Sequence, residues 1–192
     1  MERDVHYRRA KSEGYRARSA YKLLEIFERF GSLSEAQTVV DLCAAPGSWS
    51  QVLSQRLSNA SIVAVDLQDI EPVGNVRIIK GDITSQAVAD EIKNILKRKA
   101  DLIVCDGAPE VTGLHDMDEY FQSSLIQASC AMCREFLGDA GVFITKVFTG
   151  ETPKHVIEEL EEFFEEVTVF KPKSSRIESR EAFAVCNGMK MC

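Results

Sequence analysis

The sequence predicts an α/β fold: a doubly wound, seven-stranded, mostly parallel sheet with helices on both faces. Short, continuously apolar runs recur along the chain, and segments with helical periodicity separate them. Strands that are apolar on both faces are typical of a parallel sheet buried between two layers of helices and joined by right-handed crossovers. At 192 residues, of which 45% are hydrophobic, the chain is expected to form a single domain, residues 1–192.

The first half of the chain is expected to supply a helical arm and three strands. Residues 1–30 form a basic, helical N-terminal arm that ends near Gly31. A turn of small residues, 44–47, separates the first strand from the helix that follows it. The strands are expected at 38–43, 61–66 and 76–82, and the helix at 48–57.

The second half is expected to supply four more strands and three helices. One helix begins after Thr84 or Ser85, either of which can cap it, and a long helix covers 118–137. Residues 158–166 are rich in glutamate and share an apolar stripe that starts at Ile157, which predicts an amphipathic outer helix. The strands are expected at 101–106, at 141–146, at about 167–170 and at about 182–186.

Charge is unevenly distributed along the sequence. The formal net charge of −7 argues against a nucleic-acid partner, yet residues 1–24 hold seven basic and three acidic side chains, a local charge of +4. Tyr15 and Tyr21 interleave this stretch, a combination that can bind a phosphate backbone and stack on bases. A second basic stretch lies at 171–180, and the acidic stretch 158–166 conceals both in the total. Taken alone, each basic stretch is more simply explained as solvated surface charge.

Composition also predicts location and cysteine chemistry. No apolar run near the start resembles the core of a signal sequence, and none approaches the roughly 20 residues of a membrane span. We therefore expect a cytoplasmic protein without a membrane partner, whose six cysteines are reduced thiols. Cys130 and Cys133 have the spacing of metal ligands, but they lie in an expected helix without a second pair, so no metal site is expected.

A charged residue stands at or near the carboxyl end of five expected strands. These residues are Asp41, Asp66, Asp82, Asp106 and Lys146. The carboxyl ends of parallel strands meet at one edge of the sheet, where doubly wound folds bind their ligands. Because five charged side chains at one edge are not easily structural, the sequence predicts a ligand site there.

The turn 41–49 indicates which ligand this edge binds. It matches neither the three-glycine dinucleotide turn nor the lysine-bearing loop that binds nucleoside triphosphates. Carboxylates would repel phosphates but suit a cationic, phosphate-free adenosine ligand, of which S-adenosylmethionine is the common one. Asp66 is expected to bind the ribose hydroxyls, and Asp82 to lie beside the adenine. Trp49 is expected either to line the ligand or to anchor the first helix in the core.

Four motifs resemble the FtsJ (RrmJ) family of RNA ribose 2′-O-methyltransferases, and the resemblance covers nearly the whole chain. These motifs lie at 16–23, 41–49, 106–109 and 179–183. The resemblance implies a Rossmann-like fold that uses S-adenosylmethionine as methyl donor. Three segments are most similar to the eukaryotic tRNA branch, which modifies anticodon-loop riboses at nucleotide 32, nucleotide 34 or both. They lie at 48–53, 64–68 and 105–116.

The resemblance also implies the site residues. A Lys-Asp-Lys-Glu tetrad falls on Lys22, Asp106, Lys146 and Glu181, with Lys146 as the proton acceptor. Methyl transfer to a ribose hydroxyl needs an oriented oxygen and a base, and a lysine is a base only when neutral. The Lys22 ammonium and the donor sulfonium both disfavour a proton on Lys146. By the same resemblance, S-adenosylmethionine is expected to contact Gly47, Trp49, Asp66, Asp82 and Asp106.

Three alternatives are consistent with parts of the sequence. The first is the same chemistry on another RNA, ribosomal RNA or a messenger cap, which only the branch resemblance separates from tRNA. The second is a non-catalytic RNA-binding module, which would keep the basic arm but lose tetrad members, and all four are present. The third, a nicotinamide oxidoreductase, is disfavoured by the missing three-glycine turn. The tRNA branch further implies accessory proteins that select the target nucleotide.

Overall fold

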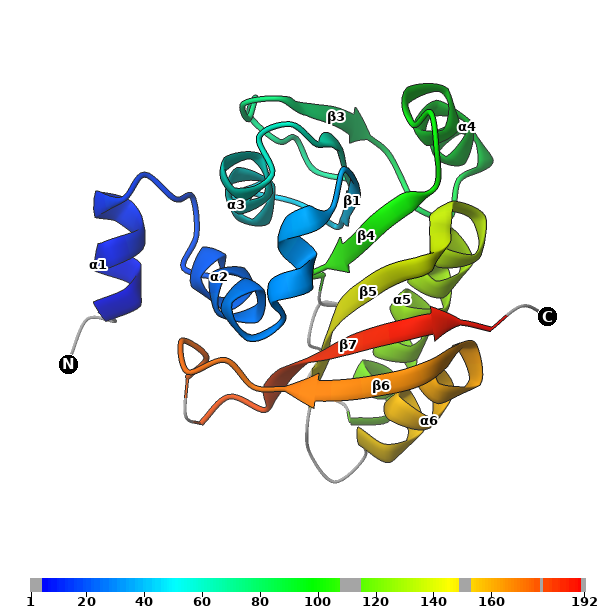
Figure 1. Ribbon diagram of the computed structural model, residues 1–192. Helices are drawn as coiled ribbons and strands as arrows, with labels where there is room; N and C mark the ends of the chain where they lie inside the picture. The colour runs from blue at the N-terminus through cyan, green and yellow to red at the C-terminus, as the bar shows by residue number, and fades with distance from the viewer. Residues whose placement is uncertain (1–4, 108–114, 149–152, 177, 191–192) are drawn as a thin grey trace.

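The computed structural model describes residues 5–107, 115–148, 153–176 and 178–190, and within these ranges seven strands form one sheet (Figure 1). The strand order is β3-β2-β1-β4-β5-β7-β6. Strands β1 to β5 pair in parallel, and β7 runs antiparallel between β5 and β6, which confirms the predicted mostly parallel sheet. The bounds are β1 (Thr38–Leu42), β2 (Ser61–Asp66), β3 (Val76–Lys80), β4 (Ala100–Cys105), β5 (Leu137–Phe148), β6 (Phe164–Phe170) and β7 (Glu181–Met189).

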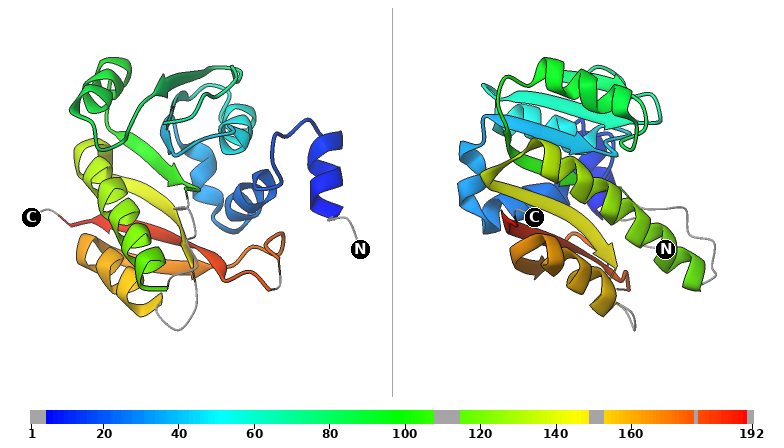
Figure 2. Two further views of the ribbon diagram at one scale, coloured as in Figure 1. Left: turned by 180° about the vertical axis from the view of Figure 1, so that it is seen from behind. Right: turned by 90° about the vertical axis from the view of Figure 1, so that its right-hand side faces the viewer.

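Helices cover both faces of the sheet, as predicted. On one face α4, α5 and α6 pack against the strands, and on the other face α2, α3 and the 3₁₀ helix η1 do so, each layer enclosing its own apolar core (Figure 2). Helix α1 lies at the outer edge of the molecule, beside α2 (Figure 1). The bounds are α1 (Val5–Ser12), α2 (Ala20–Arg29), η1 (Gly31–Glu35), α3 (Ser48–Arg56), α4 (Gln86–Ile95), α5 (His115–Phe136) and α6 (Pro153–Phe163).

Several boundaries differ from those predicted. The arm is two helices, because the chain turns after α1 through Gly14, whose φ of +81° is the left-handed conformation typical of a helix end. The outer helix ends at Phe163, and β6 begins at Phe164. Phe164 is fully buried and its ring stacks on that of Phe143 at 5.7 Å, so packing against β5 decides this boundary. Both α5 and β5 begin earlier than predicted.

The topology brings functional elements together at one edge of the sheet. The carboxyl ends of β1, β2, β4 and β5 lie there, and so does the start of antiparallel β7, where Glu181 pairs with Phe148. Helix α2 packs against α3 and places Lys22 within hydrogen-bond distance of Glu181. In the described part of the chain, no helix combines the length and the apolar character needed to cross a membrane.

Candidate active site

Four charged side chains predicted from the sequence meet at this edge. Lys22 comes from α2, Asp106 from the residue after β4, Lys146 from β5 and Glu181 from the start of β7. The Nζ atom of Lys22 lies 2.6 Å from Oε1 of Glu181, and that of Lys146 lies 2.8 Å from Oδ1 of Asp106. A longer contact of 3.8 Å joins Lys146 Nζ to Glu181 Oε2. The four groups therefore form one chain of alternating charge.

Glu181 is the centre of this cluster. Its side chain is 12% exposed, and those of Lys22 and Lys146 are each 10% exposed. Burial opposes the ionisation of Glu181. The hydrogen bond and charge of Lys22, the charge of Lys146 and a hydrogen bond from the Ser175 hydroxyl outweigh burial, so the pKa of Glu181 lies below its ordinary value. Glu181 is therefore a carboxylate at neutral pH and fixes both amines.

Residues 171–176, predicted only as part of a basic stretch, form a loop that is fixed against α2. The two carboxylate oxygens of Glu25 accept the backbone N–H groups of Lys173 at 2.6 Å and of Ser174 at 2.8 Å. Arg18 donates to the Ser174 carbonyl at 2.6 Å. No local motif reveals this role of Glu25, because its partner Lys173 lies 148 residues away in the chain.

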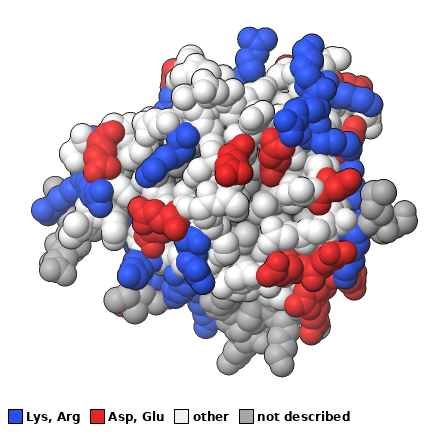
Figure 3. Space-filling model, in the orientation of Figure 1, with Lys and Arg blue, Asp and Glu red and all other residues white. Residues whose placement is uncertain are grey.

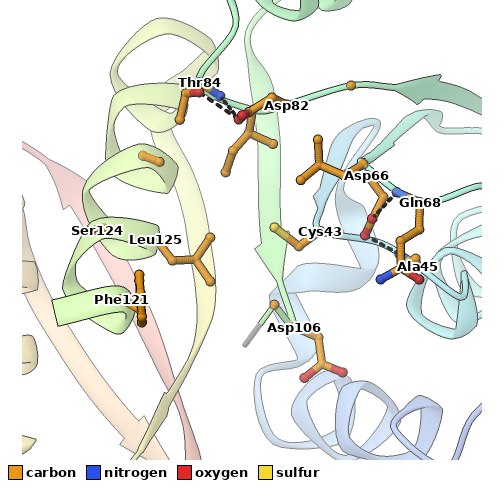
Figure 4. A pocket seen from close by; sticks show the side chains of 15 residues that line it. Cys43, Ala45, Asp66, Gln68, Asp82, Thr84, Asp106, Phe121, Ser124 and Leu125 are labelled. Carbon is orange, nitrogen blue, oxygen red and sulfur yellow. Dashed lines mark hydrogen bonds between the residues drawn. The ribbon is translucent and has the colours of Figure 1, made fainter. Parts of the chain in front are cut away.

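A cavity of about 470 Å³ lies beside the tetrad (Figure 4). Asp66, Asp82 and Asp106, three of the predicted donor contacts, are in its wall. Side chains of α5 face them across the cavity, as Figure 4 shows. Because Asp106 belongs both to this wall and to the tetrad, a ligand in the cavity would lie next to Lys146.

Hydrogen bonds fix the two outer aspartates of the cavity. Asp66 accepts the backbone N–H groups of Ala45 and Gln68, each at 2.8 Å. Asp82 accepts the backbone N–H of Thr84 at 2.8 Å and its hydroxyl at 2.7 Å, and these bonds hold the pKa of Asp82 below its ordinary value. The Thr84 hydroxyl therefore donates to Asp82 and does not cap α4. Such fixed carboxylates can accept hydrogen bonds from ligand hydroxyl and amino groups.

Gly47 and Trp49, also predicted to contact the donor, do not line this cavity. Gly47 precedes α3 with a φ of +99°, and a Cβ atom there would come within 2.5 Å of Nη1 of Arg16. Trp49 is 2% exposed, its Nε1 donates to the Ser19 carbonyl at 3.0 Å, and its ring lies 5.4 Å from that of Phe183. Trp49 thus anchors α3 in the core, the second of its two predicted roles.

Asp41 does not reach the predicted edge, and this part of the prediction is wrong. The residue is fully buried within β1, where the Ser50 hydroxyl donates to its Oδ2 at 2.6 Å. Burial raises the pKa of Asp41 to about 8, so the side chain is protonated at neutral pH. A position near the end of a strand does not show whether the side chain faces the ligand edge or the layer of helices.

The basic side chains of the arm have different roles. Arg16 donates to the carbonyl groups of Pro46, Glu71 and Pro72 at distances of 3.0, 2.9 and 3.0 Å, and so supports the turn before α3. On the face shown in Figure 3, Lys and Arg side chains gather over the 171–176 loop and, more densely, over α4 and the segment that follows it, and Asp and Glu side chains gather over α6 and β6. In the ranges that the structure describes, no group of His, Cys, Asp and Glu is arranged to hold a metal ion.

Comparison with known proteins adds to this geometry. Residues 15–189 match the FtsJ-like methyltransferase family. The chain is 50% identical over 190 residues to the tRNA (cytidine(32)/guanosine(34)-2′-O)-methyltransferase of Mus musculus, covering 97% of this chain and 59% of that protein. It is 40% identical over 186 residues to the ribosomal RNA large subunit methyltransferase E of Pelagibacter ubique, covering 97% of this chain and 92% of that one.

A solved structure agrees with these matches. The crystal structure of a putative ribosomal RNA methyltransferase from Plasmodium falciparum is similar with a TM-score of 0.76 at 29% identity, covering 91% of this chain and 98% of that one. The present chain spans less than two thirds of the length of the mouse relative. The match to the family spans all four tetrad residues and the cavity. The chain belongs to the FtsJ-like methyltransferase family.

Proposed function

We propose that this chain transfers a methyl group from S-adenosylmethionine to a ribose 2′-hydroxyl of tRNA, at nucleotide 32 or 34 of the anticodon loop or at both. The observation that carries this proposal is the position of Asp106. Its side chain lies in the wall of the carboxylate-lined cavity and also forms an ion pair with Lys146. A methyl donor in the cavity and a base are thus side by side.

The cavity suits S-adenosylmethionine in charge and in size. Its aspartates attract a sulfonium and an ammonium group, and Asp66 can accept hydrogen bonds from a ribose diol. We assign contact with the adenine to Asp82 and to the apolar side chains of α5, which line the same cavity. A volume of about 470 Å³ is within the usual range for a small-molecule site. When bound, the donor supplies an electrophilic methyl group on a positively charged sulfur.

Lys146 is the proposed base. Its Nζ donates to the Asp106 carbonyl at 2.6 Å and lies 2.8 Å from Oδ1 of the same residue. A neutral amine has two N–H groups and one lone pair, so the bond to the Asp106 carbonyl uses one donor and the lone pair is available to the ribose hydroxyl. After Lys146 takes the proton, the carboxylates of Asp106 and of Glu181, the latter at 3.8 Å, stabilise the new positive charge.

Lys22 is the proposed second cation of the site. Its ion pair with Glu181, at 2.6 Å, holds an ammonium close to Lys146. Glu181 links the two amines, because its carboxylate also lies 3.8 Å from Nζ of Lys146. We assign to Glu181 and Asp106 the role of fixing the two amines and the ribose.

The choice of tRNA as substrate is supported by the relatives. The tRNA enzyme of Mus musculus is 50% identical to this chain, and the ribosomal RNA enzyme of Pelagibacter ubique is 40% identical. Ribosomal RNA is the second candidate, favoured by the coverage of 92% of that bacterial enzyme. We place the RNA backbone against the 171–176 loop, which lies beside Lys22, and we assign the choice of nucleotide to an accessory protein.

Lys146→Ala tests the function, with Lys93→Ala, at an exposed position of α4, as the matched control. Each protein is incubated with S-adenosylmethionine and total RNA, with and without cell extract, and methylated riboses are located by mass spectrometry. Lys146→Ala is expected to lose transfer while its donor affinity, measured by calorimetry, stays within about twofold. Turnover by Lys146→Ala would exclude Lys146 as the base. Methylation of ribosomal RNA in preference to tRNA would overturn the assignment of tRNA as the substrate.

A further inference from the structure

Two thiols meet at the floor of the cavity, and the mechanism above uses neither. Cys43 lines the cavity, and its sulfur points into it (Figure 4). Cys105 is fully buried on the neighbouring strand. In the β1–β4 register Leu42 pairs with Cys105, so Cys43 is diagonally adjacent to Cys105, and the two thiols are hydrogen-bonded to each other.

The surroundings favour a thiolate in this pair. The Cys43 thiol, the backbone N–H of Gly107 and the Ser129 hydroxyl, at 3.7 Å, all donate to the sulfur of Cys105. The bond from Cys43 is the largest influence, and together these bonds outweigh burial and lower the pKa of Cys105 to about 7. The same bond, with burial, raises the pKa of Cys43. Near neutral pH the pair therefore shares one proton, and the thiolate is the reactive form.

We propose that Cys43 and Cys105 are a reversible modification site, oxidised to a disulfide by a peroxide that enters the cavity, and that this disulfide weakens binding of the methyl donor. The proton shared by the pair moves to Cys105, and the sulfur of Cys43, which faces the cavity, attacks one oxygen of hydrogen peroxide. The O–O bond breaks, a sulfenic acid forms on Cys43, and the departing hydroxide takes the proton of Cys105 and becomes the first water. The Cys105 thiolate then attacks the sulfur of Cys43, the S–S bond forms, and the hydroxide that leaves takes a proton from solvent to become the second water. The two sulfurs together lose two electrons, and the peroxide gains them.

The disulfide would change the segments that hold the donor. Cys105 directly precedes Asp106, and Cys43 directly precedes the turn in which the Ala45 N–H binds Asp66 at 2.8 Å. A disulfide requires Cβ atoms about 3.8 Å apart and a narrow range of torsion angles. To meet this geometry the two sulfurs must approach from hydrogen-bond contact to the length of an S–S bond, and the two segments must adjust around them. Both changes alter the wall that a donor contacts.

Three other described cysteines provide an internal comparison. Cys130, Cys133 and Cys186 are fully buried, and none of them lines the cavity. Burial raises the pKa of each of these thiols. Because Cys43 faces the cavity and these three thiols do not, they are expected to react with peroxide more slowly than Cys43, even though Cys130 and Cys133 are neighbours on one face of α5.

The test treats the full chain with hydrogen peroxide, with and without S-adenosylmethionine, blocks the remaining thiols and maps linked peptides by mass spectrometry. The first linkage is expected to join Cys43 to Cys105, and bound donor is expected to slow it. Donor affinity, measured by calorimetry, is expected to fall roughly tenfold and to recover with dithiothreitol. Cys43→Ser and Cys43→Ala are both expected to remove the linkage and to make donor affinity insensitive to peroxide. Two variants are used so that, if one of them fails to fold, the other still provides the test.

Three results would overturn the proposal: no linkage between Cys43 and Cys105, an earlier linkage among the other cysteines, or unchanged donor affinity in the linked protein. The effect on affinity rests on the proposed function, because it needs the donor to occupy this cavity. The peptide map does not depend on methyl transfer. A missing linkage would therefore leave the methyltransferase proposal intact, whereas failure of the reduced protein to bind the donor would count against that proposal instead.

Discussion

Replacing Asp41 with asparagine is expected to flatten the pH dependence of the free energy of unfolding. Asp41 is fully buried, and burial raises its pKa to about 8 from an ordinary value of 3.8. Between these two pH values the folded protein keeps a proton on Asp41 that the unfolded chain releases. Folding therefore takes up one proton, and the free energy of unfolding falls as the pH rises through this window.

The magnitude follows from this proton. A proton bound only in the folded state changes the free energy of unfolding by about 1.4 kcal/mol per pH unit. From pH 5 to pH 8 the loss is up to about 4 kcal/mol, a large part of the roughly 5–15 kcal/mol that stabilises a domain. Asparagine cannot ionise but keeps the acceptor for the Ser50 hydroxyl. The amide nitrogen of asparagine replaces Oδ1 of Asp41, which has no hydrogen-bond partner, and burying it unpaired lowers the free energy of unfolding by about 1–3 kcal/mol at every pH. The informative quantity is therefore the slope of the free energy of unfolding against pH.

Urea unfolding from pH 5 to pH 8 measures this slope for the wild type, for Asp41→Asn and for the control Asp69→Asn, whose side chain is 85% exposed. The free energy of unfolding of the control is expected to change with pH as in the wild type. Between pH 5 and pH 8, Asp41→Asn is expected to lose up to about 4 kcal/mol less of its free energy of unfolding than the wild type does. Because Asp41 is already uncharged at pH 7, donor affinity there is expected to change by less than about twofold. Parallel pH profiles for the wild type and Asp41→Asn would refute the inference that Asp41 is protonated in the folded protein.

Three further substitutions test the site. Glu181→Gln removes the charge that fixes both lysines, and methyl transfer is expected to fall about 10–100-fold with donor affinity unchanged; wild-type turnover would show that the charge is dispensable. Glu25→Gln weakens two bonds to the 171–176 loop, and RNA affinity in filter binding is expected to fall about tenfold, whereas a change in stability alone would make Glu25 purely structural. Trp49→Phe removes the bond to Ser19 and is expected to cost about 1–2 kcal/mol in urea unfolding. A loss of donor affinity in Trp49→Phe would place that side chain in the donor site.

The sheet could be predicted because its signals are local. Each strand is a short apolar run, and Asp106 and Lys146 stand at the ends of two such runs, so their meeting follows from parallel topology. The rest of the tetrad is different, since Lys22 and Glu181 lie 159 residues apart and no period or local motif connects them. Only the family resemblance links these two residues in advance of the structure.

Asp41 and Trp49 show what a local pattern does not convey. Both belong to the turn that was predicted to hold the ligand, yet both face the layer of helices formed by α2 and α3. Ser50 on α3 binds Asp41, and the Ser19 carbonyl before α2 binds Trp49. The direction of these side chains depends on where the N-terminal arm packs, which is a long-range contact. The role of Glu25 is hidden for the same reason.

That packing joins the basic arm to the acidic cavity. Arg16 donates to the Pro46 carbonyl at 3.0 Å, and the hydroxyls of Ser19 and Ser48 share a hydrogen bond of 2.7 Å. The segment that leads to Lys22 is thus bound to the turn that begins α3 and borders the donor cavity. Some of the arm's positive charge therefore holds the fold together instead of facing solvent. Because the same contacts support both elements, Lys22 and the turn before α3 keep a fixed relation, and a change that loosens the arm is expected to weaken the proposed donor binding along with the proposed RNA binding.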